Sequence, residues 1–253
     1  MIRESFCFLP RVGAGKESQI WQSGVTDWNS FLDAQKVPGF SVQTKQTCDS
    51  LLHTAREQLL AENANWFGAM LDTQDHWRLY NTFKDDAVFL DIETDGYYGS
   101  VTMVGMYDGR ETKTFVRGAN LDRTLLAEQL AKHKMIVTFK GKTFDLPILK
   151  KYFNLTMPLL HVDLRFVCQK AGLTGGLKQI EKDLGIHRSS EVDGMQGIDA
   201  VYLWQQFKQT KNNKYLELLI QYNEEDVINL PAIASKVIPP LWTKTRKNFT
   251  SEL

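Results

Sequence analysis

The chain contains 253 residues, enough for one large domain or for a domain with a small additional module. Lys plus Arg and Asp plus Glu both number 30, so the net charge is zero and argues against a wholly basic nucleic-acid-binding surface. The three cysteines are far apart and form no CxxC pair, which fits a reducing compartment and argues against a disulfide framework. No apolar run approaches the roughly 18 residues needed to span a bilayer, and no signal-peptide pattern is present. We therefore expect a soluble, cytoplasmic protein with no membrane partner.

The first 83 residues predict helices, because they lack the alternation typical of strands. The stretch CDSLLHTAREQLLAEN has a helical period, with Asp49 or Ser50 as its expected N-cap. Near residues 11–32, a G-x-G sequence, a helix, a turn at Gly24 and a second helix resemble a helix–hairpin–helix-like element. This element either presents backbone N–H groups to a phosphate or forms a small packing module around three aromatic residues, Trp21, Trp28 and Phe31. The region has no basic excess, which favours the packing module.

The pattern changes at residue 84, where strands begin. Residues 87–93, 100–107 and 111–118 predict three strands, and the DGR stretch at Asp108 indicates a hairpin between the second and third. A helix, a strand, a helix with Pro147 in its first turn and a fifth strand are expected at 121–133, 135–141, 143–153 and 159–164. The remaining helices are expected at 164–172, 177–185, 198–209 and 214–237. This order predicts an α/β fold with a mixed sheet flanked by helices.

These patterns divide the chain into three predicted regions. Residues 1–83 form a helical N-terminal region, residues 84–240 form the domain that contains the sheet, and residues 241–253 form a basic tail. The boundary near residue 84 follows the change from helical to strand patterning.

Two carboxylates end the first predicted strand. Asp91 and Glu93 are two residues apart, so their side chains point to the same face of that strand. An acidic pair in this position often lies in a solvated turn beyond the sheet, and that interpretation stays open for the pair alone.

Two further acids favour a functional site over a solvated turn. Asp226 shares a helical stripe with Leu219, Tyr222 and Leu230, so it is expected on a buried face, where it needs a counter-charge from a metal ion, a lysine or an arginine. Asp145 begins a helix directly after a strand, where an acid is also favoured by the helix dipole. Together the four acids indicate a site for hard divalent cations such as Mg²⁺ or Mn²⁺, which bind oxygen ligands and cancel the repulsion between carboxylates.

Three short motifs resemble those of the tyrosine-type DEDD 3′–5′ exonuclease superfamily, which has a ribonuclease H-like fold. They are DIE at Asp91–Glu93, FD at Phe144–Asp145 and YNEED at Tyr222–Asp226. The stretches HWRLYNTF, FLDIETDG, VTFKGKTFDLPIL, HVDLR and LKQIEKDLGI are similar to the YprB-like predicted exonuclease group. The resemblance covers most of residues 76–235.

The resemblance implies a metal-dependent nuclease that hydrolyses phosphodiester bonds of DNA or RNA from a single-stranded 3′ end. Asp91 would bridge two divalent ions, Glu93 and Asp226 would hold the ion that carries the attacking water, and Asp145 would support the second ion. Tyr222 would orient that water. A non-cleaving module of nuclease-like fold that binds nucleic acid or protein is the alternative, and an endonuclease of the same fold is a third possibility.

One position departs from the family pattern, and two neighbouring residues are left out of the catalytic set. Lys140 stands where the second motif usually has an asparagine. His161 is expected to be a hydrogen-bonded structural residue, and Asp163 is expected to be a helix cap.

Residues 132–151 contain six lysines and one acid. The lysines either attract phosphates or form an ordinary solvated surface.

Overall fold

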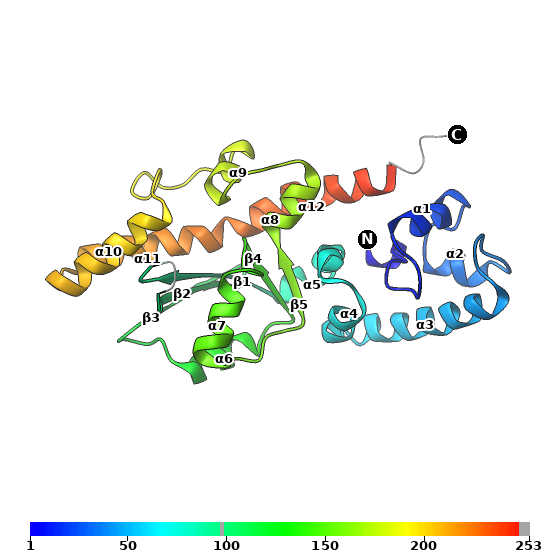
Figure 1. Cartoon of the computed structure of the whole chain (residues 1–253), viewed down its shortest axis with the longest axis horizontal. Helices are drawn as coiled ribbons and strands as arrows, with labels where there is room; N and C mark the ends of the chain where they lie inside the picture. The colour runs from blue at the N-terminus through cyan, green and yellow to red at the C-terminus, as the bar shows by residue number, and fades with distance from the viewer. Residues whose placement is uncertain (97–98, 248–253) are drawn as a thin grey trace.

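A five-stranded sheet lies at the centre of the computed structural model, which describes residues 1–96 and 99–247 (Figure 1). The spatial order is β3-β2-β1-β4-β5; the first three strands pair antiparallel, and β1, β4 and β5 pair parallel. The strands are β1 (Ala87–Thr94), β2 (Val101–Tyr107), β3 (Thr112–Val116), β4 (Met135–Thr138) and β5 (Leu160–Asp163). The predicted α/β fold, a mixed sheet flanked by helices, is confirmed.

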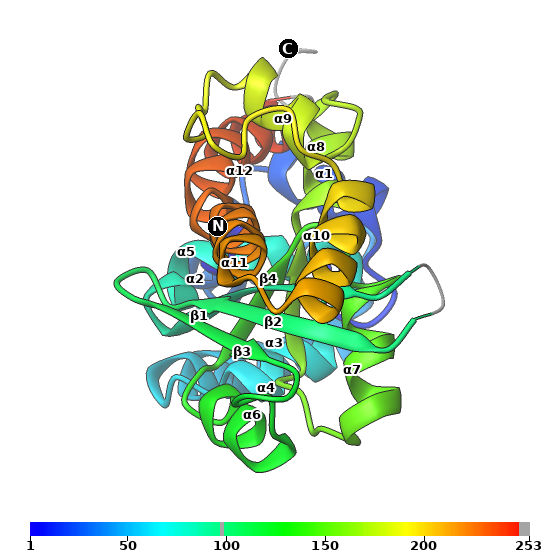
Figure 2. The same ribbon diagram turned by 90° about the vertical axis from the view of Figure 1, so that its left-hand side faces the viewer.

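Helices cover both faces of the sheet, because the side chains of β1 point alternately to the two faces and are apolar on each. Val88, Leu90 and Ile92 pack into one apolar cluster with residues of α6 (Arg123–Leu130) and α7 (Asp145–Phe153). Ala87 and Phe89 point the other way, into the main core. Figure 2 shows α6 and α7 on one side of the sheet and α10 and α11 on the other.

The second face carries the C-terminal helices. These are α8 (Leu164–Ala171), α9 (Leu177–Asp183), α10 (Gly197–Thr210), α11 (Asn213–Ile228) and α12 (Leu230–Lys247). Leu219 and Tyr222 of α11 pack against Met103 and Val116 of the sheet and Trp204 of α10. The predicted apolar stripe of α11 therefore faces the sheet, and it brings Asp226 to the end of β1.

The N-terminal region is built from short helices and one long helix. They are η1 (Ile2–Glu4), α1 (Ala14–Gln22), α2 (Trp28–Asp33), α3 (Val42–Leu60), α4 (Ala64–Met70), η2 (Thr73–Leu79), α5 (Tyr80–Phe83) and η3 (Lys84–Asp86). The turn after α1 places Gly24 at a φ of 88°, a conformation that glycine adopts readily. Three aromatic residues are buried beside it, as the packing interpretation requires: Trp21, Trp28 and Phe31.

The N-terminal helices and the sheet share one apolar core, which runs from Ile2 to Leu241. A buried ion pair reinforces it: Arg78 Nη1 lies 2.8 Å from Glu17 Oε1, and the two side chains are 5 % and 1 % exposed. The Trp77 and Trp242 rings, from η2 and α12, also meet edge to face with centroids 6.1 Å apart. The division at residue 84 stays a prediction, but the two regions bury apolar surface together.

Two helix boundaries differ from the predictions. Helix α3 begins at Val42, because Ser41 caps it through the N–H of Thr44, so the predicted cap at Asp49 or Ser50 is wrong. The helix predicted at 214–237 is two helices that meet at Asn229, because Pro231 has no N–H and is tolerated only in the first turn of a new helix.

Helix α12 includes residues 241–247 of the predicted basic tail, and residues 248–253 lie outside the described residues. No helix in the described part of the chain has the length and apolarity needed to cross a membrane.

Candidate active site

Strand β1 and helix α11 bring three of the predicted site residues together. One carboxylate oxygen each from Asp91, Glu93 and Asp226 lies within 4.8 Å of the other two. Glu93 and Asp226 are only 9 % and 6 % exposed, so the group is largely removed from solvent. Three carboxylates this close repel one another unless a cation lies between or beside them.

A buried asparagine fixes the position of Asp91. Asn223 Nδ2 donates a hydrogen bond to Asp91 Oδ2 at 2.9 Å, and Asn223 is fully buried. Gly105 of β2 lies opposite Asp91, and a Cβ atom at Gly105 would come within 2.0 Å of Asn223 Oδ1. Glycine at this position therefore allows α11 to approach the sheet. Our sequence analysis missed Asn223, although a glycine inside a strand is a signal of such a close approach.

Asp145 lies beside this group but is held separately. It is 3 % exposed, and its Oδ1 accepts a hydrogen bond of 3.1 Å from the N–H of Ile92, between Asp91 and Glu93. It also begins α7, so the helix-dipole interpretation applies as well. Burial raises the pKa of Asp145 to about 7 although the Ile92 N–H opposes that rise. The structure thus places the fourth acid next to the cluster, outside the three-oxygen group itself.

Tyr222 lies one helical turn before Asp226 and is 3 % exposed. Its hydroxyl oxygen accepts a hydrogen bond from Lys178 Nζ at 2.8 Å. Burial raises the pKa of the Tyr222 hydroxyl above its usual value, and the negative charge of Asp226 adds to this effect. The hydroxyl is therefore protonated at neutral pH. Because a lysine ammonium can only donate, the Tyr222 proton stays available to a further acceptor.

Two basic side chains from the α9 region neutralise Asp226. Lys178 Nζ and Arg188 Nη2 lie 3.5 Å and 2.5 Å from the same oxygen, Asp226 Oδ1. Glu181 orients Arg188 through two hydrogen bonds of 2.7 Å. The basic partners that the sequence left open as an alternative for Asp226 are therefore present. Our sequence analysis did not identify Lys178 or Arg188, because nothing in their local sequence marks them as partners of Asp226.

Burial and mutual repulsion dominate the electrostatics of the cluster. Burial raises the pKa of Asp91 well above its ordinary value, and the charges of Asp145 and Asp226 raise it further. Burial also raises the pKa of Glu93, with Asp226 as the next cause. A divalent ion would relieve this repulsion. The donor set consists of carboxylate oxygens, which fits a hard cation such as Mg²⁺ or Mn²⁺.

The loop after β4 is held by Asp163. This residue caps α8 through the N–H of Arg165, and its carboxylate also accepts hydrogen bonds from the N–H groups of Lys140 and Lys142. Lys140 has a φ of 73°, a left-handed conformation that asparagine tolerates better than lysine. His161 Nε2 lies 2.9 Å from Thr138 Oγ1. The predictions of a cap at Asp163 and of a hydrogen-bonded His161 are confirmed.

A comparison with protein-family profiles identifies the superfamily of this chain. A profile described as the RNase H superfamily matches residues 88–238, which is more than half of the chain. The chain belongs to the RNase H superfamily. The matched range begins inside β1 and ends in α12, so it overlaps all five strands and includes every predicted site residue of this RNase H superfamily member.

Two solved structures are similar to this RNase H superfamily member. One is the family B DNA polymerase from the hyperthermophilic archaeon Pyrobaculum calidifontis, with 17 % identity and a TM-score of 0.49, covering 60 % of this chain and 24 % of the polymerase. The other is Escherichia coli RNase D, an exoribonuclease involved in structured RNA processing, with 16 % identity and a TM-score of 0.45. That match covers 72 % of this chain and 49 % of RNase D. The chain thus spans half or less of both proteins, and no curated protein matches it.

Proposed function

We propose that this protein hydrolyses phosphodiester bonds of nucleic acid in a reaction that depends on divalent metal ions. The observation that carries the proposal is the group of three carboxylate oxygens within 4.8 Å at the end of the central strand. A protonated tyrosine hydroxyl beside this group supplies a second functional group of the right chemistry. Membership of the RNase H superfamily supports the same conclusion.

In the proposed mechanism, Asp91, Glu93 and Asp226 would hold a divalent ion, and Asp145 would support a second ion. When bound, the ions supply positive charge that stabilises the attacking and leaving oxygens of the phosphodiester. Asn223 keeps the Asp91 carboxylate in place. Tyr222 positions the attacking water through its hydroxyl, and Lys178 fixes that hydroxyl by donating to it. Cleavage from a 3′ end follows from the resemblance of the motifs to the DEDD exonucleases.

The alternative is a module of the same fold that binds nucleic acid or protein without cutting. The contacts of Lys178 and Arg188 with Asp226 favour it, because they neutralise one carboxylate without a metal ion. Lys178 is 30 % exposed, however, so its flexible side chain can turn toward solvent when an ion binds.

The test uses single-stranded DNA and RNA oligonucleotides labelled at the 5′ end, with Mg²⁺, Mn²⁺ or EDTA. A 3′–5′ exonuclease should give a ladder of shortened labelled products, and a circular single strand should stay intact. Asp91→Asn should abolish cleavage, whereas the exposed Asp85→Asn should cut like the wild type. Metal should also raise the melting temperature of the wild type, since an ion at 100 times its Kd adds about 2.7 kcal/mol to stability.

The outcomes separate the candidate functions. Metal-dependent cleavage that is lost in Asp91→Asn supports the proposal, and cleavage of the circular strand points to an endonuclease. A melting shift with metal but no cleavage of either nucleic acid favours the binding module. Cleavage that persists at the wild-type rate in Asp91→Asn contradicts the site assignment.

A further inference from the structure

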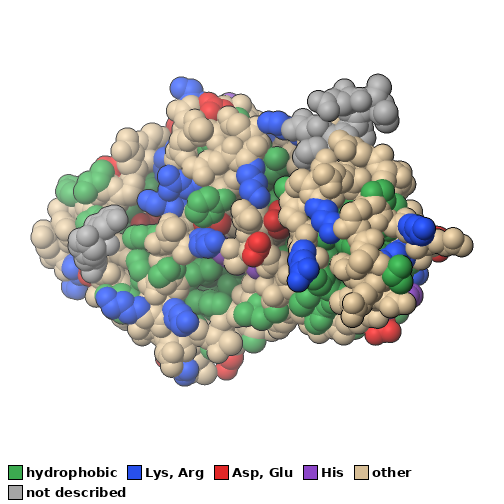
Figure 3. Space-filling model, turned by 45° about the vertical axis from the view of Figure 1, so that its right-hand side comes forward, with side chains coloured by type: hydrophobic (Ala, Val, Ile, Leu, Met, Phe, Trp, Pro, Cys, Tyr) green, Lys and Arg blue, Asp and Glu red, His purple; other side chains and the backbone are tan. Residues whose placement is uncertain are grey.

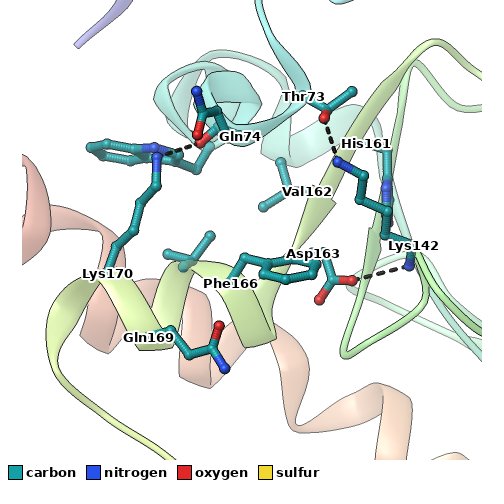
Figure 4. A pocket seen from close by; sticks show the side chains of 11 residues that line it. Thr73, Gln74, Lys142, His161, Val162, Asp163, Phe166, Gln169 and Lys170 are labelled. Atoms are coloured by element: carbon teal, nitrogen blue, oxygen red, sulfur yellow. Dashed lines mark hydrogen bonds between the residues drawn. The ribbon is translucent and has the colours of Figure 1, made fainter. Parts of the chain in front are cut away.

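A pocket opens where η2, the end of β5 and helix α8 meet (Figure 4). Its cavity has a volume of about 510 Å³, within the range of roughly 300–1,000 Å³ that is common for small-ligand sites. The polar, charged and aromatic side chains that line it and bear on ligand binding are Thr73, Gln74, Lys142, Asp163, Phe166 and Lys170. The catalytic cluster described above uses none of them.

Two lysines stand on opposite sides of this pocket, with the ring of Phe166 between them (Figure 4). Lys142 Nζ donates to Thr73 Oγ1 at 2.6 Å, and Lys170 Nζ donates to the carbonyl oxygen of Gln74 at 2.7 Å. An ammonium group has three donors, so each lysine keeps hydrogen-bonding capacity for an anion after this contact. The existing bonds hold both side chains near the pocket, which lowers the entropy cost of binding a phosphate.

The acid in the pocket, Asp163, is held by the backbone and forms no ion pair with either lysine among the described residues. Asp163 is 7 % exposed, and its carboxylate is bound by the three backbone N–H groups of Lys140, Lys142 and Arg165. The face shown in Figure 3 carries several Lys and Arg side chains around a hollowed, partly apolar area, in which a few Asp and Glu side chains are also exposed. Asp75 Oδ1 also lies 3.8 Å from Lys170 Nζ, but Arg78 Nε lies closer to it, at 3.1 Å. The ammonium groups of Lys142 and Lys170 are therefore the groups in the pocket that an anionic ligand would contact.

The apolar part of the pocket offers a flat surface. Phe166 is 39 % exposed, and Lys142 Nζ lies 6.0 Å from its ring centroid. An exposed aromatic ring flanked by ammonium groups is the arrangement by which proteins hold single-stranded nucleic acid, with the base stacked on the ring and the phosphate near the cations.

The pocket lies at the same edge of the sheet as the acidic cluster. Strands β1, β4 and β5 are parallel, so the end of β1 with Glu93 and the end of β5 with Asp163 face the same way. Strand β5 is two positions from β1, which corresponds to about 10 Å. Lys142 also belongs to the connection that leads into Asp145. A nucleic-acid strand can therefore reach both places.

We propose that this pocket binds one nucleotide of a single-stranded nucleic acid, with its base on the Phe166 ring and its two flanking phosphates at Lys142 and Lys170. A neighbouring phosphodiester of the same strand then lies at the acidic cluster, so this inference rests on the nuclease function proposed above. Phe166 and the two lysines are binding residues, and the chemistry of cleavage stays with the carboxylates.

Binding is measured separately from cleavage, by fluorescence anisotropy of labelled dT and rU oligonucleotides with the full chain in EDTA. Phe166→Ala and Phe166→Leu should weaken binding on the order of 10- to 100-fold, because base stacking is lost. Phe166→Tyr, which keeps the ring, should bind like the wild type. Leu60→Ala is the matched control, since it removes an apolar side chain that is 88 % exposed on α3.

The lysines are tested by the salt dependence of the same binding. Lys142→Gln and Lys170→Gln should each reduce the slope of log K against log salt by about 0.7, the value for one lost phosphate contact on a single strand. The exposed Lys36→Gln should leave the slope unchanged. Circular dichroism and melting curves check that each variant is folded, and Phe166→Tyr supplies a ring-bearing comparison if Phe166→Ala is unstable.

The two proposals fail in different ways. Normal oligonucleotide binding by folded Phe166→Leu overturns this inference while leaving the nuclease function intact. In the cleavage assay, Phe166→Ala should raise KM with little change in kcat; a lower kcat at unchanged KM would also overturn it. Ring-dependent binding by a wild type that never cleaves supports the pocket and contradicts the nuclease function. A wild type that binds neither oligonucleotide overturns the inference.

Discussion

Replacing Tyr222 with phenylalanine separates packing from chemistry at the candidate active site. The Tyr222 ring is buried against the sheet, and phenylalanine keeps that packing while removing only the hydroxyl. The lost contact is the 2.8 Å hydrogen bond from Lys178 Nζ. The substitution therefore tests whether the hydroxyl acts on the substrate or only supports the fold.

The stability cost follows from that single hydrogen bond. A hydrogen bond to a charged donor contributes about 1.5–3 kcal/mol, but water can solvate the freed Lys178 ammonium, so we expect a loss of about 1 kcal/mol. In a chain of this size, that loss lowers the melting temperature by about 2–4 °C. The kinetic cost should be larger, because loss of a group that positions or handles a proton typically slows a reaction about 10²–10⁴-fold.

The assay is single-turnover cleavage of the 5′-labelled oligonucleotide in Mn²⁺, with thermal unfolding of the same preparations. The control is Tyr202→Phe, which removes a hydroxyl from a tyrosine that is 54 % exposed on α10 and should change neither quantity. The melting shift caused by Mn²⁺ should persist in Tyr222→Phe, since the carboxylates are intact. A Tyr222→Phe variant that cleaves at the full rate would refute a role in positioning water and leave Tyr222 as a packing residue.

Three further predictions concern stability, measured by urea unfolding in EDTA. Folded Asp145 has a pKa of about 7 and unfolded aspartate about 3.9, so between these values the folded state holds the extra proton and the free energy of unfolding falls as pH rises. Asp145→Asn should reduce this slope, to which Asp91 and Glu93 also contribute because their pKa values are raised as well; an unchanged slope would contradict the assignment. Arg78→Met leaves buried Glu17 without its cationic partner, with only the N–H groups of Phe6 and Cys7 still donating to it, and should cost about 3–5 kcal/mol. Lys113→Met, in an exposed ion pair, should cost less than about 1 kcal/mol; equal losses would argue against burial as the cause. Lys140→Asn should stabilise the protein by up to about 1 kcal/mol, because asparagine tolerates the φ of 73° better, and a loss of stability would show that the lysine side chain contributes there.

The basic side chains near Asp226 have a consequence for metal binding. Lys178 and Arg188 stabilise the cluster without an ion, so a cation that binds as proposed would compete with them for Asp226 Oδ1. Such competition would lower the affinity of the site for the metal ion. The same two basic side chains reduce the repulsion among the carboxylates while the protein folds. Lys178 connects the charge of Asp226 with the Tyr222 hydroxyl, since its Nζ contacts both groups.

The sequence by itself determined the elements of the sheet and the side chains that share each face. A strand alternates with a period of two, so Asp91 and Glu93 had to lie on the same face, opposite Val88, Leu90 and Ile92. The hairpin at Asp108 also depends on local interactions, because the Asp108 side chain accepts hydrogen bonds from the N–H groups of residues 110 and 111. Local periodicity and turn chemistry act over a few residues, and the sequence shows them directly.

Only the tertiary structure decided which distant residues complete the site. Asn223 reaches Asp91 across 132 positions in the chain, and it does so because Gly105 leaves room for α11. Lys178 and Arg188 reach Asp226 from the α9 region, although nothing in their local sequence marks them as its partners. Such contacts depend on how whole helices dock on the sheet, and docking is set by apolar burial that sums over the shared core from Ile2 to Leu241. Short, separate motifs carry the carboxylates of the candidate site, whereas the side chains that balance their charge come from the packing of the entire chain.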